Sequence, residues 1–195
     1  MNLNSIAADR SSAPQATANT NGGGESGNSN QASATPQAAP TPVLLVNAGG
    51  TATGGFLADT GFSGGTTAST TATITLSGAT YPAPAAVYQT WRTGAKKSPN
   101  FSYTLGGLTP STSYTLRLHF SENSLTKSGA RKFDVTVNGT KVLSAFDVFA
   151  AAGGAKKAVI RSVTATANAS GQVVINFTAV TTAQPPIING LEVDQ

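Results

Sequence analysis

Two segments of the chain alternate apolar and polar side chains with a period of two, the pattern of a half-buried β-strand. In residues 114–120 (YTLRLHF) every second side chain is apolar, so one face of the segment is expected to be buried. The side chains expected on the other face are those of Thr115, Arg117 and His119. Residues 133–137 (FDVTV) repeat the pattern and lead into Asn138-Gly139, a strong signal for a tight hairpin. These patterns predict antiparallel β-structure.

Short apolar or alternating runs separated by Gly, Pro and Asn recur along the rest of the chain. Strands are predicted at residues 43–46, 70–76, 87–91, 101–105, 113–120, 132–138, 141–146, 157–165, 172–178 and 187–193. Helical periodicity is nearly absent, and only residues 144–152 suit a short helical turn. We therefore expect an all-β fold, an antiparallel two-sheet β-sandwich of jelly-roll type. The inward side chains are predicted to be Leu116, Leu118, Phe120, Phe133, Val135, Val137, Val173, Ile175 and Phe177.

Residues 1–42 differ in composition from everything that follows. They are almost entirely Ser, Ala, Asn, Gly, Thr, Gln and Pro, with three charged side chains and no aromatic residue. Such a segment cannot bury enough apolar area to offset its conformational entropy, so an extended, non-globular arm or linker is expected. It lacks the apolar run of a secretory signal. Residues 43–195 are then expected to form one domain with one core.

Charge and composition exclude several function classes. The net charge is +4, and the arm contributes −1 of it, which leaves about +5 on the domain. The basic residues come as short pairs (Lys96-Lys97, Arg131-Lys132, Lys156-Lys157) without interleaved aromatics, so they favour solvated loops over a nucleic-acid platform. Attraction to an acidic polymer is the alternative. No segment is long and apolar enough to insert into a membrane, and the absence of cysteine excludes disulfides and thiolate metal sites.

The sequence gives weak signals for catalysis. The stretch from Gly61 to Gly65 (GFSGG) matches a serine-hydrolase nucleophile elbow, but the residues after it suit a strand rather than the required helix. No acidic residue lies between Ser63 and His119, the only histidine. His119 and Glu122 are three residues apart at a strand end, where a hydrogen bond to a loop is the favoured interpretation over acid–base or metal chemistry. We therefore predict that the protein is not an enzyme.

No cofactor is expected. One histidine without cysteine is a poor donor set for a transition metal. Structural calcium bound by Asp59, Asp147 or Asp194 with backbone carbonyls stays open, although no Asp-rich loop supports it.

Tyr88 and Arg92, in the segment VYQTWR, suit carbohydrate chemistry best. Sugar rings stack their C–H faces on aromatic rings, while their hydroxyls bond to planar polar groups. Strict alternation from residue 87 to 92 would place Tyr88 and Arg92 on one face and Trp91 on the other. An equally open alternative is that Trp91 is a buried anchor and Tyr88 packs against a neighbouring strand.

The order and spacing of motifs from about Val43 to Val193 resemble those of a malectin-like carbohydrate-binding domain. The matching motifs are VNAGG (46–50), FLADTGFSGG (56–65), VYQTWR (87–92), LRLHFSE (116–122), GARKFDVTVNG (129–139), FDVFAAAGG (146–154), VVINF (173–177) and INGLEV (188–193). The resemblance implies a non-catalytic jelly-roll sandwich that holds glucose-type disaccharides through loop aromatics and an acidic residue. It places the tyrosine of the family's Tyr-Gln-Thr motif on Tyr88.

Three positions depart from the family pattern. The paired aromatics that follow the family's Phe-Ala-Glu motif fall on Ser124 and Leu125, and the late acidic ligand falls near Gln184. The residues predicted to contact a carbohydrate are therefore Tyr88, Arg92, Phe62, Gln184 and Ser124.

Two functions of different classes follow from the sequence. The first is an extracellular or surface-exposed binding module that recognises a glycan or serves as an adhesive tip on its arm. The second is a structural decoration or appendage protein of a large assembly, such as a phage virion, anchored through residues 1–42. Prolines at 14, 36, 40 and 42 favour an extended backbone that can pair with a partner chain.

Overall fold

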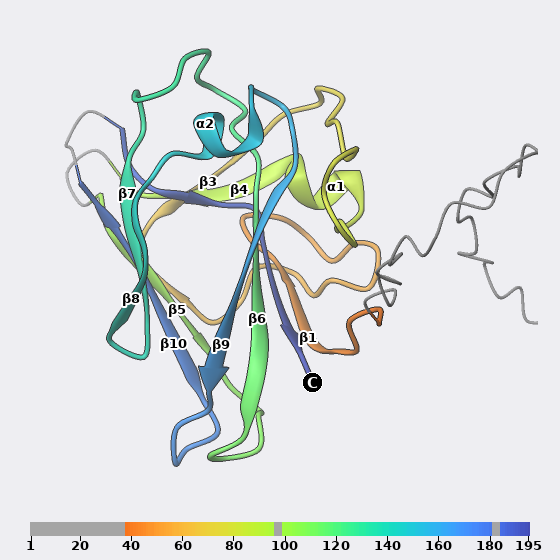
Figure 1. Cartoon of the computed structure of the whole chain (residues 1–195), viewed down its shortest axis with the longest axis vertical. Coiled ribbons are helices and arrows are strands. Elements are labelled where there is room, and N and C mark those ends of the chain that lie inside the picture. Colours follow the sequence, from red (N-terminus) through yellow and green to blue (C-terminus); the bar gives the residue numbers. More distant parts are fainter. Residues whose placement is uncertain (1–37, 96–98, 181–183) are drawn as a thin grey trace, which may run out of the picture. The chain divides into compact units, whose positions relative to one another are not determined.

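The computed structural model describes residues 38–95, 99–180 and 184–195, which form an almost entirely β-stranded domain (Figure 1). The strands are β1 (Pro42–Asn47), β2 (Phe62–Ser63), β3 (Thr66–Ser69), β4 (Thr90–Thr93), β5 (Phe101–Leu105), β6 (Ser113–Phe120), β7 (Phe133–Val137), β8 (Thr140–Phe146), β9 (Val159–Thr166), β10 (Val173–Ala179), β11 (Ile187–Ile188) and β12 (Gly190–Asp194). The two short helices are α1 (Ala85–Tyr88) and α2 (Val148–Ala152). The predicted arm lies outside the described residues over 1–37, as does the lysine pair at 96–97.

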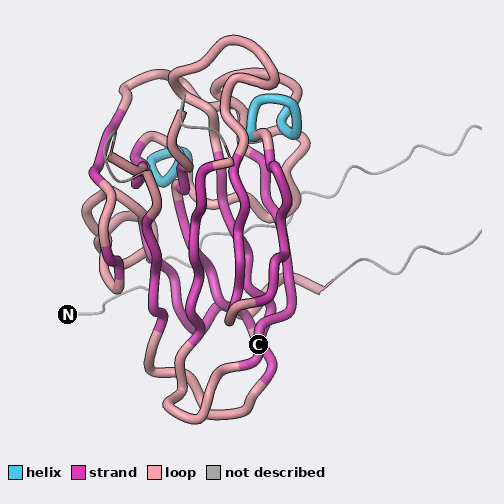
Figure 2. Tube along the Cα trace, turned by 90° about the vertical axis from the view of Figure 1, so that its left-hand side faces the viewer, coloured by secondary structure: helices cyan, strands magenta, loops and turns pink. Residues whose placement is uncertain are grey.

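All strands pair antiparallel, in three sheets. The four-stranded sheet has the order β1-β12-β6-β9, and the five-stranded sheet has the order β2-β5-β10-β7-β8. A short third sheet, in the order β11-β4-β3, was not foreseen. The strands of the two larger sheets run along the same direction of the domain (Figure 2). The prediction of an all-β antiparallel fold is confirmed, whereas the jelly-roll connectivity stays a prediction.

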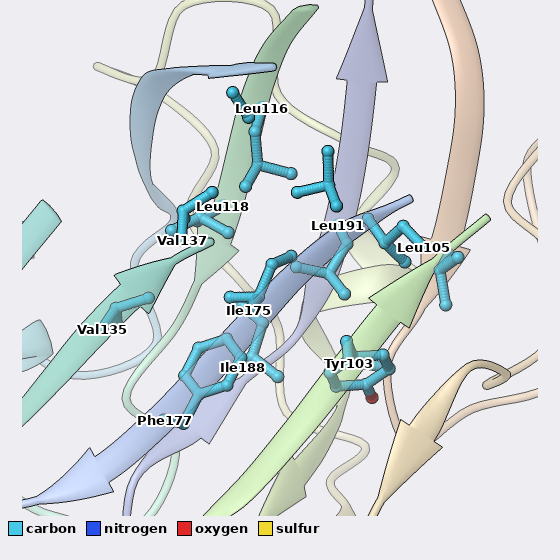
Figure 3. Close-up of a cluster of buried hydrophobic side chains, with 14 of the residues drawn as sticks. Tyr103, Leu105, Leu116, Leu118, Val135, Val137, Ile175, Phe177, Ile188 and Leu191 are labelled. Atoms are coloured by element: carbon cyan, nitrogen blue, oxygen red, sulfur yellow. The ribbon is translucent and has the colours of Figure 1, made fainter. Parts of the chain in front are cut away.

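The core lies between the two larger sheets, and all nine predicted inward side chains are buried in it, none with more than 4% of its surface exposed. Leu118 and Leu191 approach from the four-stranded sheet and meet Ile175 and Phe177 of the five-stranded sheet (Figure 3). Phe177 also stacks on Phe101, with ring centroids 4.7 Å apart. Each fully buried aliphatic or aromatic side chain of this kind contributes roughly 1.5–3 kcal/mol, so burial holds the sandwich together without disulfides.

Two strand predictions are wrong, and both fall between residues 70 and 91. The strand there is Thr66–Ser69, and residues 70–76 are irregular. Residues 85–88 form the single turn α1, which Pro84 precedes at the N-cap and which begins with two alanines, the best helix formers. The short turn predicted within 144–152 is confirmed as α2, which begins where the Asp147 side chain accepts a hydrogen bond from Ala150 N–H and ends at Gly153 in the left-handed conformation.

A second, smaller core covers the outer face of the four-stranded sheet. Its buried members are Phe56, Ile74, Ala83, Val87, Tyr88 and Ala158. Gly190 of β12 permits this cover, because a Cβ there would lie 2.7 Å from a methyl carbon of Val87. The polar face of β6 is therefore solvated only in its first half: Thr115 is exposed, but Arg117 and His119 are buried, at 6% and 0% exposure.

Candidate functional site

Phe62 and Arg92 come together as predicted, in a small platform at the edge of the five-stranded sheet. The guanidinium carbon of Arg92 lies 3.4 Å from the centroid of the Phe62 ring. Tyr103 meets the same ring edge-on, with centroids 6.5 Å apart. Phe62 is 46% exposed, and it and Tyr81 are the two aromatic side chains in the described part of the chain that are notably solvent-exposed. One face of Phe62 therefore rests on protein while the ring stays accessible.

Arg92 supports this ring and is not itself available to a ligand. It is 4% exposed, and both its Nε and its Nη2 donate to Asp59 Oδ2, at 3.0 and 2.5 Å. Its Nη1 donates to the carbonyl of Gly64 at 2.9 Å. Tyr103 donates its hydroxyl to the other oxygen of Asp59 at 2.7 Å, and burial raises the pKa of that hydroxyl above its usual range. The buried Arg92–Asp59 ion pair is therefore rigid, because hydrogen bonds from Tyr103 and to Gly64 engage its remaining polar atoms.

The loop that carries Phe62 is fixed by close backbone contacts. Gly65 has a φ of +72°, and a Cβ at this position would lie 2.8 Å from the Thr93 carbonyl. Only glycine therefore lets the loop lie this close to β4. Ser63, the candidate nucleophile, sits in β2 and is followed by strand β3 rather than by a helix, which excludes the nucleophile-elbow geometry.

Tyr88 is placed differently from the prediction. Its side chain is fully buried, so the expected exposure is wrong, and its ring cannot stack on a ligand in this conformation. The reason is α1, which breaks the alternation assumed from residue 87 to 92. Trp91 is also buried, at 8% exposure, so the alternative with Trp91 as an anchor and Tyr88 in packing is the one observed.

The Tyr88 hydroxyl instead ends a buried polar row. It lies 2.8 Å from His119 Nδ1 and accepts a hydrogen bond from Ala83 N–H. His119 Nε2 lies 2.8 Å from Glu192 Oε2, which also accepts from Arg117 Nη1 at 2.7 Å. Because the carboxylate can only accept, we assign the ring proton to Nε2 and let Tyr88 donate to Nδ1. Burial lowers the pKa of His119 below its usual value, so the imidazole is neutral.

This row has the residue types of a proton relay, but it is closed to solvent. Tyr88 and His119 have no exposed surface, and Glu192 is 6% exposed, so no substrate reaches them. Its effect is to fasten α1 and the loop before it onto the outer face of the four-stranded sheet. The carboxylate partner of His119 is thus Glu192, 73 positions away, and not Glu122, which the sequence spacing had suggested.

Ser124 and Gln184 flank a third buried ion pair, after Arg92–Asp59 and Arg117–Glu192. Arg131 Nε donates to Glu122 Oε2 at 2.7 Å, and the backbone N–H groups of Ser124 and Leu125 donate to Glu122 Oε1. Arg131 also donates to the carbonyl of Pro185, next to Gln184. Glu122 therefore does organise a strand-end loop, as expected. The contact roles of Ser124 and Gln184 stay predictions.

Two asparagines that the sequence analysis missed connect these regions. Asn189 is fully buried and donates to the carbonyls of Tyr88 and Thr90, at 2.9 and 2.8 Å, while its side-chain oxygen accepts from Ser121 N–H at 2.7 Å. Asn123 donates to the Tyr88 carbonyl at 2.8 Å. A single buried amide has no periodic signal, so only the fold reveals it.

Two of the three aspartates considered for calcium, Asp59 and Asp147, are engaged by separate partners. Asp59 binds Arg92 and Tyr103, and Asp147 caps α2 and also accepts from Gly129 N–H. Within the described ranges, no three acidic, histidine or cysteine side chains lie close enough together to hold a metal ion. In the same residues, no helix is long and apolar enough to cross a membrane.

Comparison with known proteins supports the resemblance noted in the sequence. The family model of the malectin domain matches residues 42–194, nearly all of the described domain. A kinesin-like protein of rice, KIN-14E from Oryza sativa subsp. japonica, is 37% identical over 152 residues, which is 71% of this chain and 13% of that protein. The chain therefore corresponds to a small part of this relative.

Solved structures share the fold at low identity. The extracellular domain of ANXUR2 from Arabidopsis thaliana superposes with a TM-score of 0.65 at 22% identity, over 78% of this chain and 48% of that one. The crystal structure of the plant peptide RALF23 in complex with FER and LLG2 gives a TM-score of 0.66 at 20% identity, with the same coverage. This chain thus spans about half the length of the matched chains, and the likeness extends to the fold alone.

Proposed function

The chain belongs to the malectin domain family, and on that basis we propose that it is a carbohydrate-binding module exposed at a cell surface or outside the cell. Malectin domains are non-catalytic binding domains, and this one is no enzyme. The surface location is supported by the extracellular ANXUR2 domain that shares the fold.

The observation that carries the carbohydrate proposal is the Phe62 platform. A sugar ring stacks on an aromatic face that is accessible and already held in place, because binding then costs little ordering entropy. Phe62 meets both conditions, with 46% of its surface exposed and Arg92 fixed beneath it.

The affinity is expected to be weak. Positions 124 and 125 carry no aromatic residue, so one accessible ring makes the apolar contact. Its burial offsets little of the entropy that is lost on association. We expect dissociation constants from about millimolar to tens of micromolar.

Phe62→Ala is expected to lower the affinity for a saccharide at least about tenfold, because burying one aromatic ring is worth roughly 1.5–3 kcal/mol. Glycan arrays on the wild-type protein would select the saccharide, and calorimetric titration would compare the variants. The fold should persist, since the lost cation–π contact costs on the order of 2 kcal/mol and Phe62 is an exposed residue of an edge strand.

Tyr81→Ala is the matched control, because it removes the other solvent-accessible aromatic side chain, 42% exposed on a different loop. It should leave the affinity unchanged. Loss of binding in Tyr81→Ala but not in Phe62→Ala would move the site to the loop before α1. Wild-type affinity in both variants would contradict stacking on either ring.

A structural role through residues 1–42 is the second candidate, and it is supported by their composition alone. Small uncharged side chains and prolines suit an extended segment that another chain captures. Deleting residues 1–37 is expected to leave the melting temperature of the domain unchanged and to abolish retention by the assembly in co-sedimentation. Full retention of the shortened chain would assign attachment to the domain itself.

A further inference from the structure

Asp194, near the end of β12, is buried without a hydrogen-bond partner. Its residue exposure is 3%, and neither carboxylate oxygen accepts a hydrogen bond from any group in the described part of the chain. An isolated carboxylate in such a place costs several kcal/mol as an anion, so its charge must be reduced or compensated.

The surrounding charges do not balance. Asp194 and Glu192 are two residues apart on one strand and so share a face, which Arg117 of β6 also occupies through its pairing with Glu192. His119, the other titratable group that β6 presents here, is neutral. The facing residues of β1 are Pro42 and Leu45, which carry no charge. The loop before α1 contributes the carbonyls of Thr80 and Tyr81. Two carboxylates therefore face one cation.

We propose that Asp194 takes up a proton in the folded domain and shares it with Glu192. The loop before α1 (residues 79–83), which covers the outer face of the four-stranded sheet, is then held more firmly in mildly acidic than in neutral solution. The protonated carboxyl donates an O–H bond to Glu192, which keeps its bonds from His119 and Arg117. No bond of Arg117 has to change in this state.

Arg117 couples the protonation state of Asp194 to the loop before α1. Its Nη2 donates to the carbonyls of Thr80 and Tyr81, at 2.8 and 2.6 Å. Tyr81 has a φ of +50°, an unfavourable conformation for an aromatic residue that persists only where neighbouring contacts impose it. When Asp194 is ionised, it repels Glu192 and competes with these carbonyls for the guanidinium. The support of the strained residue weakens as a result.

The direction of the pH dependence follows from the pKa of Asp194. Burial, and next the charge of Glu192, raise this pKa to about 6 from an ordinary value near 3.8. A raised acid pKa means that the folded state binds the proton more tightly than the unfolded state, so the added stability is complete below the ordinary value and is lost as the pH rises through about 6. Burial opposes ionisation of Glu192 as well, but the hydrogen bond from His119 and the charge of Arg117 keep its pKa below the usual range.

Asp194→Asn is the variant that tests the proposal, since the amide imitates the protonated carboxyl at every pH. Thermal melts at pH 5 and pH 7.5 should show a lower wild-type melting temperature at pH 7.5. The variant should melt roughly 2–6 °C above the wild type at pH 7.5 and lose most of the difference between the two pH values. Asp134→Asn is the control, because the pKa of this carboxyl is ordinarily below the tested range and the hydrogen bond from Lys141 lowers it further. It should keep the wild-type difference.

Two further measurements on the wild-type protein test the proposal without a mutation. The side-chain carboxyl carbon of Asp194 should titrate by NMR with a midpoint near 6, and amide protection in residues 79–83 should fall over the same pH range. A midpoint below about 4.5, or an unchanged pH difference in Asp194→Asn, would overturn the proposal.

Discussion

Leu118→Asp is expected to abolish cooperative folding of the domain. Leu118 has no exposed surface and lies at the centre of β6, between two paired strands and opposite the five-stranded sheet (Figure 3). Truncation of such a leucine alone costs about 2–5 kcal/mol, and the aspartate adds a charge without a partner. The sum approaches the whole stability of a typical domain, about 5–15 kcal/mol.

The measurement for this variant is thermal or urea unfolding followed by circular dichroism. Ser113→Asp is the matched control, because it places the same side chain on an exposed position of the same strand, opposite the uncharged Thr166 of β9. It should unfold cooperatively near the wild-type midpoint. A wild-type melting temperature for Leu118→Asp would contradict the assignment of the inward face.

Arg117→Met is expected to destabilise the domain by about 3–5 kcal/mol, the second large effect. It leaves Glu192 and Asp194 buried without their cation and removes the donor to the carbonyls of Thr80 and Tyr81. Methionine keeps much of the buried volume, so the loss reports on charge and hydrogen bonding rather than on packing. Urea unfolding at pH 7.5 measures it.

Arg161→Met provides the matched control, the same substitution on the neighbouring strand β9. There the guanidinium lies near the Phe146 ring and pairs with no carboxylate of the residues that the structure describes. Its cost should stay below about 1 kcal/mol. The double variant Arg117→Met/Glu192→Leu should recover part of the loss, since removing both members of a buried pair is less costly than removing one. Equal effects of the two single methionine variants would contradict a special role of the buried arginine.

The fold could be predicted from the sequence because its signals are local. The alternation around Leu118 and Val135 and the turn at Asn138-Gly139 each arise from the pleat and the hairpin geometry of neighbouring residues. The same holds for α2, whose start at Asp147 and stop at Gly153 are encoded within one turn. These features identified the inward face of the sandwich and, through the order of the motifs, the malectin family.

The candidate site depended on tertiary structure. Alternation determines which side of β6 carries Arg117 and His119, but it does not determine whether that side meets water or a second layer. Here α1 and the loop before it cover it, so Tyr88, which looks like a surface aromatic in the sequence, becomes the end of a buried row to Glu192. The ion pair of Arg92 with Asp59 and the packing of Arg92 against the Phe62 ring likewise join residues about 30 positions apart. Hydrophobic period and turn chemistry act between near neighbours, whereas burial of a polar group is decided by which distant segment packs over it.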